Sequence, residues 1–321
     1  MIEALRAGVQ SAWRLRALAA LLLALNLAAA GLLAVPLAAV LGRDLENRGA
    51  APHLVEGFDY DWWLRFSNGR DFAGSFGPEM LGAGFAFRNV DLLLRGELPG
   101  RLFSNEDAAP SGAEPLVLGL GAAYLLLQTI LAGGVLAALR APRGGFALRG
   151  FAHACGLYLG PIARVTLLAL ALDAFVFLLD AALAAWCDSR ARESLTEATA
   201  LAWSFGRHAA LLAALLSVHV LSGYAKALVV LEERRSASLA LLSALGFVLG
   251  RLRLVVGHFL AIGLLGLALL ATFVAADGLL PVTGYRTQLL AFALMQSFVL
   301  LRIALRLALA GGQLHLLRRL R

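Results

Sequence analysis

The chain has 321 residues, of which 60% are hydrophobic, and its mean hydropathy is +0.78. Soluble domains are about 45–50% apolar, so this composition excludes an ordinary soluble protein and predicts an integral membrane protein. The formal charge is +7, but the arginines stand in short segments between apolar runs and form no basic face with interleaved aromatic residues. The sequence therefore predicts no nucleic-acid partner.

Long apolar runs predict an all-α, polytopic transmembrane helix bundle with six spans in a single membrane domain, residues 1–321. The first run follows basic residues, as in a signal peptide, but a signal peptide has an apolar core of only about 7–15 residues. We therefore expect an uncleaved span, with a cleaved signal as the alternative. The predicted spans are residues 17–41, 115–139, 165–187, 202–226, 254–276 and 288–311.

The segments between these spans alternate in charge. Those assigned to the inside carry 15 Lys/Arg against 3 Asp/Glu, and those assigned to the outside carry 10 against 16. Because short basic loops stay in the cytoplasm, this alternation predicts that both termini are cytoplasmic. The 27 arginines against one lysine indicate a GC-rich bacterial genome, so the predicted location is the bacterial cytoplasmic (inner) membrane.

Residues 42–114 form the one long hydrophilic segment, with 12 acidic and 7 basic residues. Aromatic residues cluster near its start, and a second apolar stretch covers residues 76–94. Amphipathic aromatic rings favour the lipid headgroup region, so one or two helices lying on the outer membrane face are expected. A soluble carbohydrate-binding or catalytic loop is the alternative. The candidate interfacial aromatic residues are Tyr60, Trp62, Trp63 and Phe66.

Two segments on the inner side are predicted to lie at the membrane surface. Residues 146–164 are expected to form an interfacial helix that bends into the third span near Pro161. Residues 232–253 are expected to form an amphipathic connector helix on the inner leaflet, where membrane lipids, a protein partner or a second copy could bind. An ordinary connector with Glu–Arg pairs is the alternative. The candidate residues are Tyr224, Lys226, Glu232, Glu233, Arg234 and Arg235.

Ionisable residues inside the predicted spans form a candidate polar layer. Charges at the centre of a membrane helix cost about 2.5–3.5 kcal/mol each, so they need partners or a route to the interface. At equal depth and opposite charge, Arg302 is expected to pair with Asp173, while Arg306 reaches the inner interface. Such residues either hold helices together or line a polar cavity. The candidates are Asp173, Asp180, His219, His258, Arg302 and Arg306.

Motifs for catalysis, cofactors and metals are missing from the sequence. It contains no nucleophile elbow, phosphate-binding glycine loop or zinc-protease helix, and no compact metal-ligand spacing. Its two cysteines, Cys155 and Cys187, lie at opposite ends of one helical region, beyond disulfide reach within the chain. No catalytic residue, cofactor or metal is predicted.

Several motifs carry a family resemblance. They are Tyr224-Ala225-Lys226, residues 229–236 (VVLEERRS), Asp61-Trp62-Trp63 with Phe66, Ala122-Ala123-Tyr124 and Ala132-Gly133-Gly134. The chain resembles a family of uncharacterised bacterial six-span integral membrane proteins, distantly similar to the membrane domain of some glycerophosphodiester phosphodiesterases. It departs from that pattern at Gly223, where an acidic residue is expected, and at Leu252-Arg253, where a proline is expected. The resemblance implies a fold and no activity.

Three functions remain open from the sequence. The favoured one is a non-enzymatic scaffold or accessory component that binds lipid or partner proteins. The second is a transporter or permease-like protein that moves a small polar or anionic solute, or a lipid, past the polar layer. The third is an enzyme acting on lipid headgroups at acidic residues of the outer loop.

Overall fold

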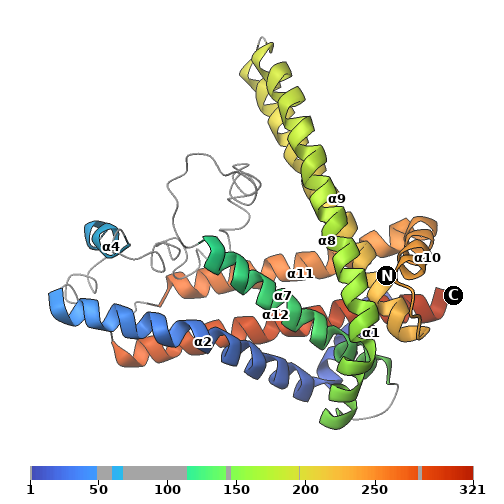
Figure 1. Cartoon of the computed structure of the whole chain (residues 1–321), viewed down its shortest axis with the longest axis horizontal. Helices are drawn as coiled ribbons and strands as arrows, with labels where there is room; N and C mark the ends of the chain where they lie inside the picture. Colours follow the sequence, from blue (N-terminus) through green and yellow to red (C-terminus); the bar gives the residue numbers. More distant parts are fainter. Residues whose placement is uncertain are drawn as a thin grey trace. The chain divides into compact units, whose positions relative to one another are not determined.

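The computed structural model describes residues 2–48, 60–67, 114–141, 146–194, 196–280 and 284–320. Within these ranges the ordered elements are helices and no strand occurs (Figure 1). The helices are α1 (Ile2–Arg14), α2 (Arg16–Arg48), α4 (Tyr60–Ser67), α7 (Glu114–Arg140), α8 (Leu148–Arg192), α9 (Glu197–Leu231), α10 (Ala237–Gly250), α11 (Leu252–Gly278) and α12 (Tyr285–Leu320).

The described helices include five that are long and apolar enough to cross a bilayer. They lie in α7, α8, α9, α11 and α12, where the sequence predicts the second to sixth spans. A sixth candidate joins α1 to the first part of α2, Ile2–Arg14 with Arg16–Leu32, across a break at Leu15. The described part of the protein is thus all-α, and its long apolar helices are those of a multi-pass membrane protein.

The chain divides into two compact units. Unit 1 contains Met1–Leu15, Leu127–Ile262 and Leu307–Arg321, and unit 2 contains Arg16–Leu126 and Gly263–Arg306. Helices α7, α11 and α12 each contribute residues to both units.

Unit 1 contains the antiparallel pair α8 and α9, which contact each other along their length (Figure 1). At 1.5 Å per residue, the 45 residues of α8 extend about 68 Å and the 35 of α9 about 52 Å, well beyond a hydrocarbon core of about 30 Å. Near their connection, the rings of Trp186 and Trp203 meet edge to face at 5.1 Å. The expected interfacial helix at residues 146–164 is not separate from the third span, because α8 is one continuous helix from Leu148 to Arg192 with Pro161 inside it.

The core of unit 1 surrounds the last two turns of α9. Tyr224 and the run Ala227 to Val230 have exposures of 1% or less. Small and branched side chains of the neighbouring helices are equally buried, as is typical of a closely packed interior. These are Ile162 and Val165 of α8, Ala240 and Ala244 of α10, and Leu314 and Leu317 of α12, all at 2% exposure or less.

The other half of the α8–α9 pair presents large apolar side chains outward. Leu178 is 71% exposed and Phe205 is 69% exposed, and only 11% of the most apolar window of α8 is buried. In water such a surface would be unstable, whereas lipid chains solvate it at no cost. This exposure is a second reason to place α8 and α9 in a bilayer.

Glycines allow α1 to approach α12 closely within unit 1. A Cβ built on Gly8 would lie 2.2 Å from the carbonyl oxygen of Ala308, and one on Gly311 would lie 3.3 Å from the Cα of Gly8. Because no side chain separates the two backbones at this crossing, it follows the small-residue packing that membrane helices use.

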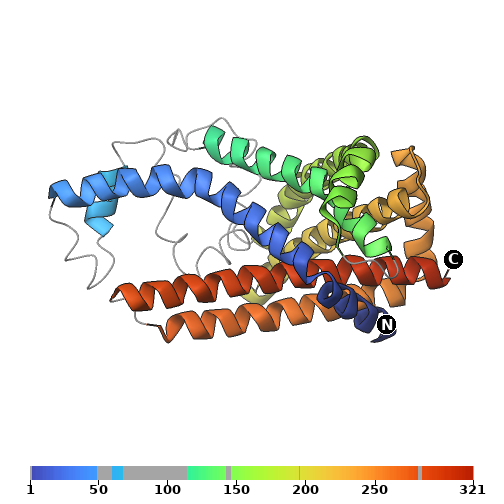
Figure 2. The same cartoon turned by 90° about the horizontal axis from the view of Figure 1, so that it is seen from below.

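In unit 2, the second half of α11 and the first half of α12 lie side by side (Figure 2). The rings of Phe273 and Phe298 stack between them at 4.4 Å. Trp62 of α4 is 4% exposed. The side chains of Tyr60, Trp63 and Phe66 and the apolar stretch at residues 76–94 lie outside what the structure describes, so the predicted outer interfacial helices stay a prediction.

Candidate functional site

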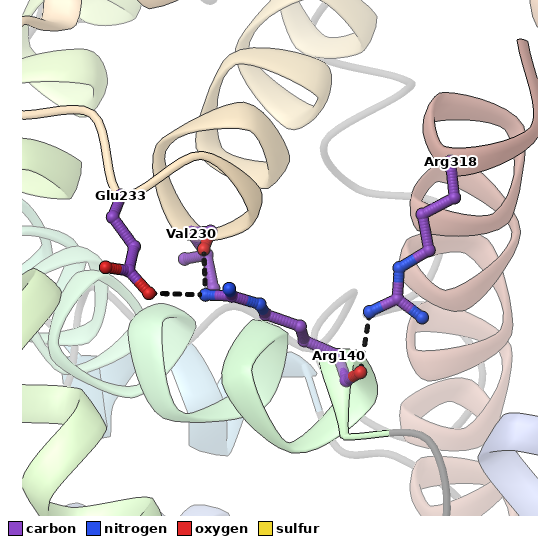
Figure 3. A network of polar contacts seen from close by, with 4 residues as sticks. All are labelled: Arg140, Val230, Glu233 and Arg318. Atoms are coloured by element: carbon purple, nitrogen blue, oxygen red, sulfur yellow. Dashed lines mark hydrogen bonds and ion pairs between the residues drawn. The ribbon is translucent and has the colours of Figure 1, made fainter. Parts of the chain in front are cut away.

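Arginine side chains contact the ends of α7, α9 and α12 in unit 1, and this region is called the basic end. It contains Arg140 at the end of α7, Glu233 in the turn after α9 and Arg318 near the end of α12 (Figure 3). The last carbonyl groups of a helix lack intrahelical donors and carry partial negative charge, so a guanidinium is a suitable cap.

Arg140 joins the ends of two helices. Its Nη1 donates to the carbonyl oxygen of Val230 in α9 at 2.8 Å and contacts Oε1 of Glu233 at 3.0 Å. Its own carbonyl oxygen, at the end of α7, accepts a 2.6 Å hydrogen bond from Arg318 of α12 (Figure 3). Arg251 in turn donates to the carbonyl oxygen of Leu320, at the end of α12. Three helix ends are thereby capped by arginines from other parts of unit 1.

The turn after α9 is a left-handed C-cap. Glu233 has a φ of 54°, a conformation that glycine adopts more easily than a residue with a side chain. The amide of Arg234 then reaches back to the carbonyl oxygen of Val229 at 3.1 Å, the six-to-one bond of a Schellman motif. The ion pair between Glu233 and Arg140 compensates part of the backbone cost of this turn.

Helix α10 is anchored to the end of α9 through this turn. Arg234 pairs with Glu232 and donates to Oγ of Ser243 at 2.7 Å. The rings of Tyr224 and Phe247 approach to 5.4 Å, and the guanidinium of Arg251 stands 5.0 Å above Phe247. The predicted inner-leaflet residues thus take part in one local structure, in which Lys226 is half-buried and Arg235 is exposed.

A groove of about 640 Å³ opens between α8 and the start of α10. Its walls contain arginine, serine, leucine and alanine side chains. Among the described residues, the guanidinium groups of Arg164 and Arg235 form no hydrogen bond or ion pair. The lining residues are Arg164, Leu167, Leu168, Arg235, Ser236, Ala237 and Ser238.

Each histidine of the predicted polar layer contacts a residue of a neighbouring helix. His258 is 1% exposed, its Nε2 lies 3.4 Å from the carbonyl oxygen of Leu309, and its ring occupies the space beside Gly312. His219 meets Phe259 edge to face at 6.0 Å. These positions show His258 holding α11 against α12 in unit 1.

The acidic and basic members of the layer are divided between the units. Asp173 and Asp180 lie on α8 in unit 1, and Oδ1 of Asp180 is buried with no hydrogen-bond partner among the described residues. In unit 2, Arg302 stands 5.7 Å above the ring of Phe298, and Arg306 donates to the hydroxyl of Tyr124 at 3.4 Å. The pairing of Arg302 with Asp173 stays a prediction. Within the described ranges, no group of three metal-ligating side chains occurs.

Sequence reasoning missed the capping arginines and the groove. From the sequence, Arg140, Arg251 and Arg318 count only as basic residues of the cytoplasmic side, and Arg164 is only the last residue of the expected interfacial helix. One sequence feature could have identified them, because each follows or precedes an apolar run at the position where a helix end needs a cap. At Gly223, where the resemblance leads to the expectation of an acidic residue, the side chain of Gln313 occupies the adjacent space.

Compared with protein-family models, with curated proteins and with solved structures, the chain matches none.

Proposed function

We propose that this protein is a non-enzymatic scaffold or accessory component of the bacterial inner membrane, and that it binds lipid through α10 and the basic end. The basic end faces the cytoplasm in this proposal, in line with the charge alternation of the sequence. We also propose that the chain belongs to the six-span bacterial membrane protein family that its sequence resembles.

The observation that carries the proposal is the surface of α10. The helix contains no charged residue, and its small residues Ala240 and Ala244 are fully buried. On the opposite side, leucines form an exposed stripe with exposures of 41–64%, namely Leu239, Leu242, Leu245 and Leu249. A stripe of this kind is stable in contact with acyl chains and unfavourable in water.

The length of α10 limits how it can contact the membrane. Its 14 residues extend about 21 Å, too short for a hydrocarbon core of about 30 Å. Arginines stand at both of its ends, Arg234 and Arg235 before it and Arg251 and Arg253 after it. Both ends therefore belong at the same membrane surface, with the leucine stripe inserted into one leaflet. Its contacts through Phe247 and Ser243 hold this stripe in a defined orientation.

The depth of α10 can be measured with a spin label. In a variant with Cys155→Ala and Cys187→Ala, a label at Leu242→Cys in liposomes should be more accessible to oxygen than to a water-soluble nickel chelate. A label at Ser194→Cys, in the described connection between α8 and α9, is the water-exposed control. If the nickel chelate reaches both positions equally, α10 is not inserted and the proposal is wrong.

Transport is the alternative, and Asp180 is the residue that favours it. Ionisable side chains inside membrane spans mark proton and ion paths, and Asp180 is a partly buried carboxylate whose Oδ1 has no hydrogen-bond partner among the described residues. Dye-loaded proteoliposomes under a membrane potential would detect a proton current. A current that Asp180→Asn abolishes would replace the scaffold proposal with the transport one, and no current in either protein would remove the proton path.

A further inference from the structure

We propose that the groove between α8 and the start of α10 binds the phosphate-bearing headgroup of an anionic phospholipid. This inference rests on the proposed function and assigns it a lipid class. The occupant has a negatively charged phosphate, which contacts the two arginines, and acyl chains, which lie along the leucines.

The charges around the groove leave a local excess of positive charge. In the run from Glu232 to Arg235, Glu232 pairs with Arg234, and Glu233 pairs with Arg140. Arg235 has no acidic partner among the described residues, and neither does Arg164 of α8, which lines the same groove. Two guanidinium groups at one groove are suited to a phosphate, because each presents several N–H donors to its oxygens.

The start of α10 adds neutral hydrogen-bond donors to the same groove. Oγ of Ser236 caps the helix by accepting from the amide of Leu239 at 3.4 Å, and lies 3.2 Å from Oγ of Ser238. The first amides of a helix have no intrahelical acceptor, so the amides of Ala237 and Ser238 are not used within α10. These hydroxyl and amide groups add hydrogen-bond donors to the site, but the two arginines define it.

The apolar wall explains why a lipid fits better than a soluble anion. Leu167 and Leu168 line the groove and are 64% and 40% exposed, and Leu239 of the neighbouring stripe is 57% exposed. Arg164 directly precedes the predicted third span, so the groove lies at headgroup depth with leucines on the membrane side. A soluble phosphate would leave this wall in water, whereas the chains of a lipid would cover it.

The test is native mass spectrometry of the full chain, titrated with phosphatidylglycerol and with phosphatidylcholine of the same chain length. A basic residue at an anionic lipid surface contributes about 1 kcal/mol, roughly five-fold in affinity, so two should give about 25-fold preference for phosphatidylglycerol. The double variant Arg164→Gln/Arg235→Gln should lose this preference. The matched control Arg190→Gln/Arg192→Gln, at the far end of α8, should keep it.

Further variants and controls decide the inference. The variant Arg164→Lys/Arg235→Lys, which keeps both charges, should retain most of the preference, and thermal unfolding in detergent should show all variants folded. A wild-type protein without lipid preference, or a glutamine variant that keeps it, would overturn the inference. Displacement of the lipid by excess inorganic phosphate would overturn it in favour of a soluble anion. The spin label on α10 tests insertion separately, so the lipid site can fail while the proposed function stands.

Discussion

Glu233 combines an unfavourable backbone conformation with a favourable ion pair to Arg140. Its φ of 54° lies in the left-handed region, which costs a residue with a Cβ about 1–2 kcal/mol. Its carboxylate contacts Arg140 at 3.0 Å, but the side chain is 67% exposed, so the ion pair contributes only about 0–1 kcal/mol. The backbone cost and the ion pair are therefore of similar size and can be separated by mutation.

Two substitutions at Glu233 separate these effects. Both Glu233→Gly and Glu233→Ala remove the ion pair, but only glycine relieves the left-handed backbone. We expect the glycine variant to have a higher free energy of unfolding than the alanine variant by about 1 kcal/mol. Thermal unfolding followed by fluorescence size-exclusion chromatography measures the difference. Equal stability of the two variants would show that this turn carries no backbone strain.

At the scale of elements, the ends of α7, α9 and α12 are connected by arginine side chains rather than by apolar contacts alone. Arg140 caps α9, Arg318 caps α7, and Arg251 caps α12. In a membrane protein the apolar surfaces of helices gain little by leaving lipid, so polar contacts and close packing decide which helices associate. The caps and the glycine crossing of α1 and α12 supply both within unit 1.

The cap on α9 should contribute more than the ion pair beside it. We expect Arg140→Gln to lower the free energy of unfolding by about 2 kcal/mol, because it removes a charged donor from the carbonyl oxygen of Val230. Glu233→Gln, which removes only the charge of an exposed partner, should lower it by less than about 1 kcal/mol. Equilibrium unfolding in mixed detergent micelles measures both changes.

The exposed pair of Arg190 and Glu193 is the control, since it lies on one helix end and caps no carbonyl of another element. Arg190→Gln should change the free energy of unfolding by less than about 0.5 kcal/mol. If Arg140→Gln proves as mild as Arg190→Gln, the capping contacts do not stabilise the basic end.

At the scale of the whole molecule, the number of spans decides on which side each terminus lies. Five described helices are individually long enough, and α1 with the start of α2 forms a sixth candidate. With six spans both termini share a side, and with five they lie on opposite sides. The charge alternation favours six, because the basic segments then all face the cytoplasm.

Single cysteines can test this topology after Cys155→Ala and Cys187→Ala. In spheroplasts, a membrane-impermeant maleimide should label Ser194→Cys but not Ser238→Cys or Ile2→Cys, and the latter two should react only after permeabilisation. Labelling of Ile2→Cys in sealed spheroplasts would show that α1 and α2 do not form a span and that five is the correct number.

The sequence by itself determined the class of protein and the position of its long apolar helices. Runs such as residues 165–187 and 254–276 are apolar over a bilayer thickness, and a backbone in lipid must satisfy its hydrogen bonds within each segment, so such runs become helices. Tertiary structure alone decided the basic end and the groove. The caps join residues 90, 178 and 69 positions apart, and the groove places Arg164 beside Arg235. A local pattern records how apolar a segment is, but it does not record which distant carbonyl a given arginine will reach.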